Sequence, residues 1–241
     1  MRRRRKRRSV RFRLVAVVVV SSAVALAVWE AFVLRIGELR DPKSVRHLSV
    51  PDGSGGSRRL VLGPANPYWT PLRAVSKELV LCVLKSEDDR FYQHDGFDWA
   101  ALRSAVEKNL ERRRYARGGS TITMQLAKNL FLWREKSLLR KVLEAYLTWR
   151  LEGSLSKQRI LELYLNAAEW GPGVYGVGEA SRRYFGKPPS ALTLGESALL
   201  AAILPNPVRW NPERAPETAM SRQRELLARL RRENALDRLA D

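Results

Sequence analysis

The sequence is poor in the residues from which metal and redox sites are usually built. Its 241 residues include one cysteine, Cys82, and two histidines, His47 and His94. A single cysteine excludes an intrachain disulfide, and no spacing of cysteine and histidine resembles a zinc site. Cys82 lies within an apolar run, where a small buried side chain is its expected role. Carboxylates and cations are therefore the groups in which to look for chemistry.

Acidic residues are absent from the first thirteen positions. Met1–Arg13 contains nine Lys or Arg, about half of the formal net charge of +19. The apolar run that follows, Leu14–Leu34, has 21 residues and one charge, Glu30. This length is sufficient to cross a hydrocarbon core of roughly 30 Å. The positive-inside bias places residues 1–13 in the cytoplasm and the remainder outside, so we predict a single N-terminal transmembrane helix at 14–34.

Two of these features have a competing interpretation. Ala25–Ala27 is a small-x-small sequence typical of a cleaved signal peptide, but the apolar run exceeds an h-region of about 7–15 residues. The positive charge, together with the basic segment Glu111–Arg117, is compatible with binding of nucleic acid. Membrane topology already explains the N-terminal cations, which would lie across the membrane from the rest of the chain. We therefore expect an uncleaved anchor and no nucleic-acid partner.

The rest of the chain divides into a tether and a helical domain. Residues 35–70 contain the flexible sequence Gly53–Ser57 and several prolines, which predicts a tether or approach segment. From residue 71 the pattern is helical, strand-like alternation is hardly visible, and a domain over 71–241 of the mainly α class is expected. Capping and breaking residues predict the following helices: 76–86, 98–113, 120–133, 137–152, 157–168, 197–204 and one that begins at 216.

The first candidate site is a carboxylate-rich segment around Glu87. Four aspartates and a histidine lie within Glu87–Asp98, and helical spacing would place Arg90 and His94 on the side of Glu87. A second Glu, Glu144, follows closely spaced cations. Two separated carboxylates with cations suit transfer of a sugar from a pyrophosphate, because one carboxylate activates the acceptor hydroxyl while the cations hold the departing anion. The plainer alternative is a surface helix end that carries acids.

Three other segments are ambiguous when each is taken alone. Two glycines precede Ser120 at a predicted helix start, where free N–H groups attract phosphate, but Ser120 is equally compatible with an ordinary N-cap. Arg140 and Glu144 lie at i and i+4, which is most often an exposed ion pair worth a few tenths of a kcal/mol. The glycine-rich and aromatic segment Asn166–Gly178 suits carbohydrate, yet a tight turn explains its glycines as well. Thr121, Gln125 and Lys128 fall at i, i+4 and i+7 and are expected to share one helix face.

Taken together and in order, these segments resemble the motifs of the peptidoglycan glycosyltransferases, glycosyltransferase family 51. Members occur in class A penicillin-binding proteins and as free-standing enzymes. The resemblance extends from Pro71 to Asn211 and implies a lysozyme-like, mainly α fold. It also implies polymerisation of lipid II into glycan strands, with inversion, on the outer side of the bacterial cytoplasmic (inner) membrane. The five motif segments are 87–98, 118–129, 140–152, 159–178 and 198–207.

The resemblance also implies roles for individual residues. Glu87 matches the base that takes the proton of the acceptor GlcNAc 4-hydroxyl, and Glu144 matches a second essential Glu on the pyrophosphate side. No tightly bound cofactor is implied, although a divalent cation (Mg or Mn) at the pyrophosphate is one option for Glu144. Met124 stands where many relatives have Gln, so we assign it no polar contact. The positions that match substrate-binding residues are Gly119, Ser120, Thr121, Gln125, Lys128, Arg140 and Asn166.

Other activities and partners follow from the same comparison of motifs. Ser154–Lys157 fits the S-x-x-K element of penicillin-binding transpeptidases, but no K-T-G occurs, so we expect no transpeptidase activity. A lytic transglycosylase or lysozyme-like enzyme is the alternative, and it would need neither an anchor nor a cationic cleft. An inactive tethered scaffold is disfavoured by the presence of both Glu residues. The implied partners are lipid II, the nascent glycan strand, the cytoplasmic membrane, penicillin-binding transpeptidases and division proteins.

One further expectation concerns the segment between the first two motifs. Arg112, Arg113, Arg114 and Arg117 lie there, and each cation near an anionic membrane surface contributes about 1 kcal/mol to binding. We expect this segment to contact head groups or the pyrophosphate, and to be poorly ordered without substrate.

Overall fold

A computed structural model describes Val17 and residues 19–23, 36–112, 119–135, 137–213 and 216–235, with only the backbone given for 106 and 108–112. The chain forms two compact units, Met1–Asp41 and Pro42–Asp241. In the first unit, the described residues are helical at Val17, 19–23 and 36–38. Among all described residues, no helix combines the length and apolar character needed to cross a membrane. Most of the predicted anchor at 14–34 lies outside the described residues, as do Arg113, Arg114 and Arg117.

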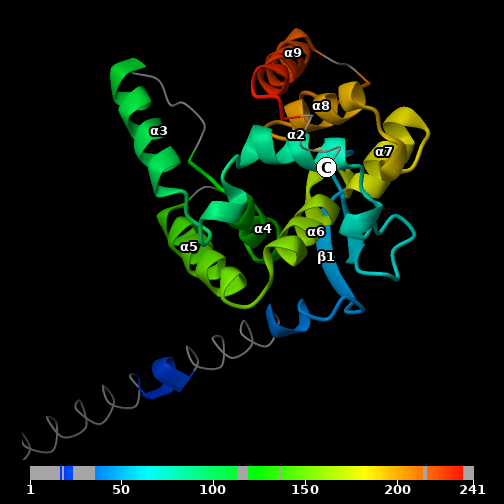
Figure 1. The fold of residues 1–241 in the computed structure, drawn as a ribbon. Helices are drawn as coiled ribbons and strands as arrows, with labels where there is room; N and C mark the ends of the chain where they lie inside the picture. Colours follow the sequence, from blue (N-terminus) through cyan, green and yellow to red (C-terminus); the bar gives the residue numbers. More distant parts are fainter. Residues whose placement is uncertain are drawn as a thin grey trace, which may run out of the picture. The chain divides into compact units, whose positions relative to one another are not determined.

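The second unit is built mainly from helices, so the predicted α class is confirmed (Figure 1). Three short 3-10 turns accompany them, η1 (Leu72–Ala74), η2 (Phe91–Gln93) and η3 (Pro189–Ala191). The α-helices are α2 (Lys77–Glu87), α3 (Trp99–Arg112), α4 (Ile122–Phe131), α5 (Leu138–Glu152), α6 (Lys157–Ala167), α7 (Val177–Phe185), α8 (Leu194–Ile203) and α9 (Glu217–Arg232).

Two helices that are apolar on most sides organise the packing of this unit. In α6 the run Ile160–Ala167 is buried except for Glu162, and α6 packs on α4. In α8 the side chains of Ser197, Ala198 and Leu200–Ile203 are buried, because α2 covers one side of this helix and α9 the other (Figure 1). A helix that is hydrophobic all round is stable only when it is buried in this way. The buried helices therefore fix where α2, α4 and α9 lie.

Side-chain caps mark most of the helix starts among the described residues. Ser76, Ser137 and Ser156 each accept a hydrogen bond from a backbone N–H three residues on, and Thr193 forms the expected capping box with Glu196. Ser156, part of the apparent S-x-x-K element, is thus a helix cap. Lys157 of the same element forms an ion pair with Glu152 at 2.8 Å, so the element has a structural explanation.

Helix α4 begins two residues later than the predicted helix 120–133, and its N-cap is one residue later. The N-cap is Thr121 and not Ser120, since the Thr121 hydroxyl accepts from Met124 N at 3.2 Å. The same hydroxyl donates to the carbonyl of Gly96 at 2.7 Å. Thr121 is buried and can satisfy both groups, whereas Ser120 remains exposed.

The structure has a β-hairpin where the sequence suggested a flexible tether. Strands β1 (Arg46–Pro51) and β2 (Ser57–Leu62) pair antiparallel, and the glycine-rich sequence between them is their turn. Asp52 closes this turn by accepting from the N–H groups of Ser54 and Gly56. Arg46 and Arg58 obscure the strand pattern in the sequence, because they occupy positions on the face of the hairpin that carries buried Val50, Leu60 and Leu62. Residues 42–70 consequently belong to the second compact unit.

The hairpin turn meets a second small sheet of β3 (Glu169–Gly171) and β4 (Val174–Tyr175). Gly173 in the β3–β4 turn has φ +71, and a Cβ added there would overlap the carbonyl of Asp52. The glycine-rich motif is therefore a tight turn that packs against the hairpin. Arg58 of β2 adds an ion pair to Glu179 of α7 at 2.6 Å.

This packing predicts that Gly173→Ala destabilises the protein more than a matched change at Gly186. Both glycines have a left-handed φ, +71 and +67, so alanine at either costs about 1–2 kcal/mol. A Cβ at Gly186 meets nothing within 4 Å, whereas at Gly173 it meets backbone that cannot give way. Chemical denaturation should show the larger loss for Gly173→Ala. Equal losses would mean that the hairpin turn is not fixed on the domain.

Candidate active site

Helix α2 ends at Glu87, whereas the predicted spacing of Arg90 and His94 requires the helix to continue through residue 94. Asp88 is its C-cap with φ −162, and the chain then turns into η2. The prediction that Arg90 and His94 lie on the side of Glu87 by helical spacing is therefore wrong. The Glu87 carboxylate accepts a hydrogen bond from Gln125 Nε2 at 2.8 Å, and Gln125 Oε1 accepts one from the Tyr164 hydroxyl at 3.1 Å.

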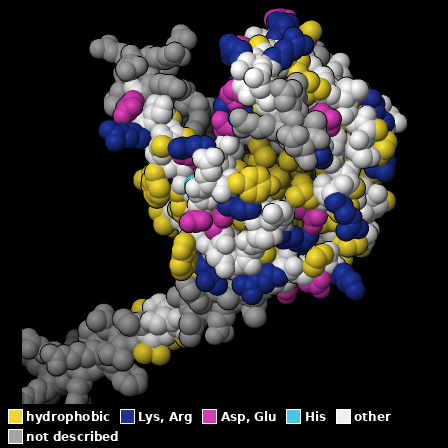
Figure 2. Space-filling model, viewed as in Figure 1, with side chains coloured by type: hydrophobic (Ala, Val, Ile, Leu, Met, Phe, Trp, Pro, Cys, Tyr) yellow, Lys and Arg dark blue, Asp and Glu magenta, His cyan; other side chains and the backbone are white. Residues whose placement is uncertain are grey.

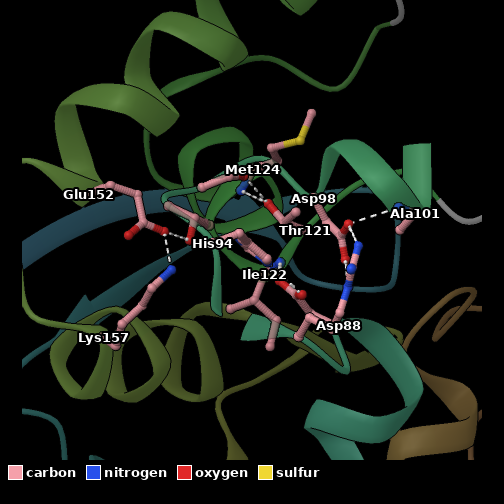
Figure 3. Close-up of polar contacts among 12 residues, drawn as sticks. Asp88, His94, Asp98, Ala101, Thr121, Ile122, Met124, Glu152 and Lys157 are labelled. Carbon is pink, nitrogen blue, oxygen red and sulfur yellow. Dashed lines mark hydrogen bonds and ion pairs between the residues drawn. The ribbon is translucent and has the colours of Figure 1, made fainter. Parts of the chain in front are cut away.

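The neighbouring carboxylate, Asp88, fixes this helix end against α4 (Figure 3). Asp88 is buried, with Oδ1 2.8 Å from His94 Nε2, and Oδ2 accepts from Ile122 N at 2.9 Å. Ile122 is the first residue of α4, where the partial positive charge of the helix attracts a carboxylate. Sequence reasoning did not single out Asp88, because several aspartates follow Glu87 and nothing in the spacing distinguishes the buried one.

The second predicted Glu lies in a buried cluster with cations. Arg140 is 9% and Glu144 3% exposed, in contrast to the exposed pair that this spacing usually gives. Arg140 Nη1 lies 3.1 Å and Lys141 Nζ 2.5 Å from the Glu144 carboxylate oxygens. Arg140 Nε is buried and has no hydrogen-bond partner among the residues that the structure describes. This cluster thus holds an unused donor, which an anion can satisfy.

Lys128 adds a further positive charge to this cluster. Burial lowers the pKa of the Lys128 ammonium, Glu144 opposes this effect, and the nearby cations Arg140, Arg134 and Lys141 lower the pKa further. Within the described part of the chain, no carboxylate lies at ion-pair distance from Lys128. Cations outnumber carboxylates here, and the protein bears an electrostatic cost that a bound anion would relieve.

A cavity of about 540 Å³ opens at the end of α2. It contains Glu87 and the predicted residues Gly119, Ser120 and Thr121. Helix α4 links this cavity to the cation cluster, because Gln125 bonds Glu87 and Lys128 lies three residues further along. The remaining residues that line the cavity are Lys85, Ser86, Asp88, Asp89, Arg90, Asp98, Ala100, Ala101 and Arg229.

Asn166 is separate from this group. It is 3% exposed, and its amide donates to the carbonyls of Thr70 and Glu162, both at 2.8 Å. Its Oδ1 accepts from Thr70 N at 2.9 Å. Since the side chain is buried and engaged on both ends, the structure gives Asn166 the role of fixing residue 70 to α6 and not that of a cleft residue.

Neither candidate metal position suits a divalent cation. The carboxylate of Glu144 has a cation on each oxygen, and Lys128 adds repulsion. Ligand atoms of Asp88, His94 and Asp98 lie within 4.8 Å of one another, but each already has a partner. Asp98 pairs with Arg90 and caps α3 through Ala101 N, while Asp88 bonds His94 and α4. These contacts explain both groups without a metal ion.

The cation cluster predicts opposite stability effects for changes at half-buried Lys128 and at buried Glu144. Because the pKa of folded Lys128 is depressed, the unfolded chain binds more protons between that pKa and about 10.5, so stability rises with pH in this window. Lys128→Met should therefore melt no lower than wild type at pH 7, and its advantage should shrink as the pH rises toward about 10.5.

Glu144→Gln should instead cost about 3 kcal/mol, because it leaves buried Arg140 without its counter-charge. Denaturant titrations of both variants across pH provide the measurement. A large loss in Lys128→Met would show that Lys128 is a structural partner in this cluster.

Comparison with known proteins adds an independent finding. A family model described as transglycosylase matches residues 57–231. The chain is 51% identical over 146 residues to a biosynthetic peptidoglycan transglycosylase of Rhodospirillum centenum, covering 61% of this chain and 63% of that protein. For proteins of the same description, identity is 51% over 142 residues in Aeromonas hydrophila (59% and 60% covered) and 48% over 158 in Pasteurella multocida (66% and 64%). The alignments thus span just under two thirds of these curated relatives.

Proposed function

Because the chain belongs to the transglycosylase family, we propose that it is a peptidoglycan glycosyltransferase that polymerises lipid II into glycan strands during cell wall biosynthesis. The observation that carries this proposal is the juxtaposition along α4. Gln125 holds Glu87 at a cavity, and Lys128, three residues further along, belongs to a cluster with more cations than carboxylates. A base beside a site for an anionic leaving group is what transfer from a diphosphate requires.

In the proposed reaction Glu87 acts as general base. Its carboxylate takes the proton of the acceptor GlcNAc 4-hydroxyl while that oxygen bonds to the donor's anomeric carbon. The bond from this carbon to the diphosphate oxygen breaks, and its electron pair leaves with undecaprenyl diphosphate. A single displacement of this kind inverts the anomeric configuration. The exposed mouth of the cavity gives Glu87 access to an acceptor.

The cation cluster stabilises the departing diphosphate. Lys128 and Arg140 supply charge that is already in place, so little reorganisation is needed as the bond breaks. Arg140 Nε, buried without a partner among the described residues, is a donor for a diphosphate oxygen. Gly119, Ser120 and Thr121 line the donor side, where the backbone can approach phosphate closely. No tightly bound cofactor is required, because the protein's own cations take the part that a divalent ion would play.

Glu144 contributes in a different way from Glu87. Both its oxygens are held by cations, and it is almost fully buried, so it does not meet the acceptor hydroxyl. We assign it the role of holding Arg140 and Lys141 in place and limiting their mutual repulsion. Its charge also reduces the cost of keeping Lys128 protonated.

The product of the reaction separates this proposal from its alternative. A lytic transglycosylase or lysozyme-like enzyme would cleave glycan strands instead of polymerising lipid II. The fold does not distinguish the two, because a lysozyme-like fold is proposed for this domain as well.

No K-T-G element accompanies the apparent S-x-x-K, so we propose no transpeptidase activity. Transpeptidases and division proteins are proposed as partners at the same membrane.

The proposed lipid substrate requires a membrane, and the exposed face of α5 suits one. Leu138, Leu139, Val142 and Trp149 are between 58% and 89% exposed, and they recur along one side of α5. Hydrophobic side chains are visible in this region, on the left side in Figure 2. Together with the predicted anchor at 14–34, this surface supports a location at the bacterial inner membrane, with the catalytic domain on the outer side.

Glu87→Gln should abolish polymerisation while binding of lipid II survives, because the amide cannot take the acceptor proton but fills the same space. General-base catalysis accelerates a reaction by about 10²–10⁴-fold, so the turnover number should fall by about 10²-fold or more. The control is Glu78→Gln, which changes a second Glu on the same helix. Electrophoresis of labelled products measures polymer. A near-normal polymer yield from Glu87→Gln would contradict the assigned base.

Replacing Leu138, Leu139 and Val142 by Gln should weaken binding of residues 42–241 to anionic vesicles. Full burial of each such side chain is worth about 1.5–3 kcal/mol, so even partial insertion gives a loss of tenfold or more. Val208 and Met220, exposed apolar residues elsewhere, serve as the matched control when changed to Gln. Sedimentation with phosphatidylglycerol vesicles measures the change. Unaltered binding would show that this face of α5 does not contact lipid.

A further inference from the structure

We propose that α9 carries a positioning device for Glu87, a ring of alternating charges made by Lys85, Asp89, Arg229 and Glu233. The inference rests on the proposed function of Glu87 and adds three residues outside the motif segments, Lys85, Arg229 and Glu233, to Asp89 of the first segment. Arg229 lies on α9, about 140 positions further along the chain than Asp89. The ring joins this helix to the last turn of α2, which ends at Glu87.

The ring is closed, because each carboxylate contacts both cations. Arg229 donates from Nη2 to Asp89 at 2.6 Å and from Nε to Glu233 at 2.7 Å. Lys85 Nζ lies 2.7 Å from Asp89 and 2.6 Å from Glu233. The hydrogen bonds from Lys85 and Arg229 lower the pKa of the Glu233 carboxyl to about 2.

Arg229 also binds the backbone of α2 directly. Its Nη1 donates to the carbonyl of Lys85 at 3.0 Å. Lys85 is in the last turn of α2, where carbonyls have no partner within the helix and need one from elsewhere. A guanidinium is suited to this task because its donors point in several fixed directions at once. All three nitrogens of Arg229 are therefore used on the protein, and this residue acts on the reaction through α2.

The ring adds a contact with α9 to the contacts that this helix end makes with α4 and α8. Gln125 and Asp88 connect it to α4, and the Ser86 hydroxyl donates to the carbonyl of Ala201 in α8 at 3.3 Å. Arg229 lines the cavity beside Glu87 and also lines a second cavity of about 410 Å³ between α2, α8 and α9. Without the ring, the last turn of α2 could shift into that second space, and a shift of about 1 Å in a reacting group can cost 10²-fold in rate.

The global fold depends little on this ring. Its side chains are between 20% and 38% exposed, and partly exposed ion pairs contribute little to stability. Hydrophobic packing of α9 on α8, through Ala219, Leu226 and Leu230, is independent of the ring. Disruption of the ring should therefore change the position of Glu87 while the protein remains folded.

The test uses Arg229→Gln in the full chain with labelled lipid II. We expect kcat to fall about tenfold or more, KM for lipid II to change less than twofold, and Arg229→Lys to recover part of the lost kcat. Arg224→Gln is the matched control, since Arg224 lies on the same helix and pairs only within α9, with Glu217, among the contacts described for it. Its kcat should equal that of wild type.

Hydrogen exchange provides a readout that a general loss of structure would not reproduce. In Arg229→Gln the amides of Asp88 and Asp89 should exchange faster, while those of Leu79–Val83 keep wild-type protection. An unchanged kcat, an equal loss in Arg224→Gln, or protection lost along the whole of α2 would each overturn the proposal. Absence of polymer from wild type itself would instead contradict the proposed function, so the two failures are distinguishable.

Discussion

Three consecutive carboxylates, Glu87, Asp88 and Asp89, stand at the carboxyl end of α2, where the helix dipole is already negative. Such an end is electrostatically unfavourable unless other elements compensate it. Each carboxylate has its own source of compensation: Gln125 for Glu87, the N-terminus of α4 for Asp88, and Lys85 with Arg229 for Asp89. The same contacts draw α4 and α9 to this point, so the requirement to neutralise one helix end also assembles the candidate site.

The cluster of Lys128, Arg140, Lys141 and Glu144 has an excess of positive charge, in contrast to the negative end of α2. Buried Glu144 offsets Arg140 and Lys141, but Lys128 remains with a depressed pKa and Arg140 with an unused donor. A protein selected only for stability would replace Lys128 with an apolar side chain, because burying an uncompensated charge is costly. An incoming diphosphate would supply the missing negative charge, so the cost in the free protein becomes part of the binding energy. This is the physical reason to regard the cluster as a site for an anion and not as a structural ion pair.

Local signals in the sequence predicted most of the helices because caps and breakers act over three or four residues, but α7 was missed, since it follows a glycine-rich turn and has no side-chain cap. Ser76, Ser137 and Thr193 mark helix starts in the sequence and in the structure. The contact between Glu87 and Gln125 was not predicted, because the motifs give residues and not their pairing. The hairpin at 46–62 was missed since Arg46 and Arg58 occupy positions on its buried face and its central glycines resemble a linker. Contacts between residues far apart in the sequence could not be predicted. No local pattern shows that Asn166 donates to the carbonyl of Thr70, or that Arg229 of α9 donates to a carbonyl of α2.

Glu87 and Glu144 are the same residue type, and the difference between their environments assigns their roles. Glu87 borders a cavity and receives a hydrogen bond from a neutral amide, so its charge is oriented without being cancelled. Glu144 is enclosed by cations and has no access to an acceptor sugar. Exchanging their roles would place the base where the acceptor cannot reach it and the counter-charge where it would repel the diphosphate. The fold therefore separates proton removal from charge stabilisation along α4, with Gln125 next to Glu87 and Lys128 three residues further along.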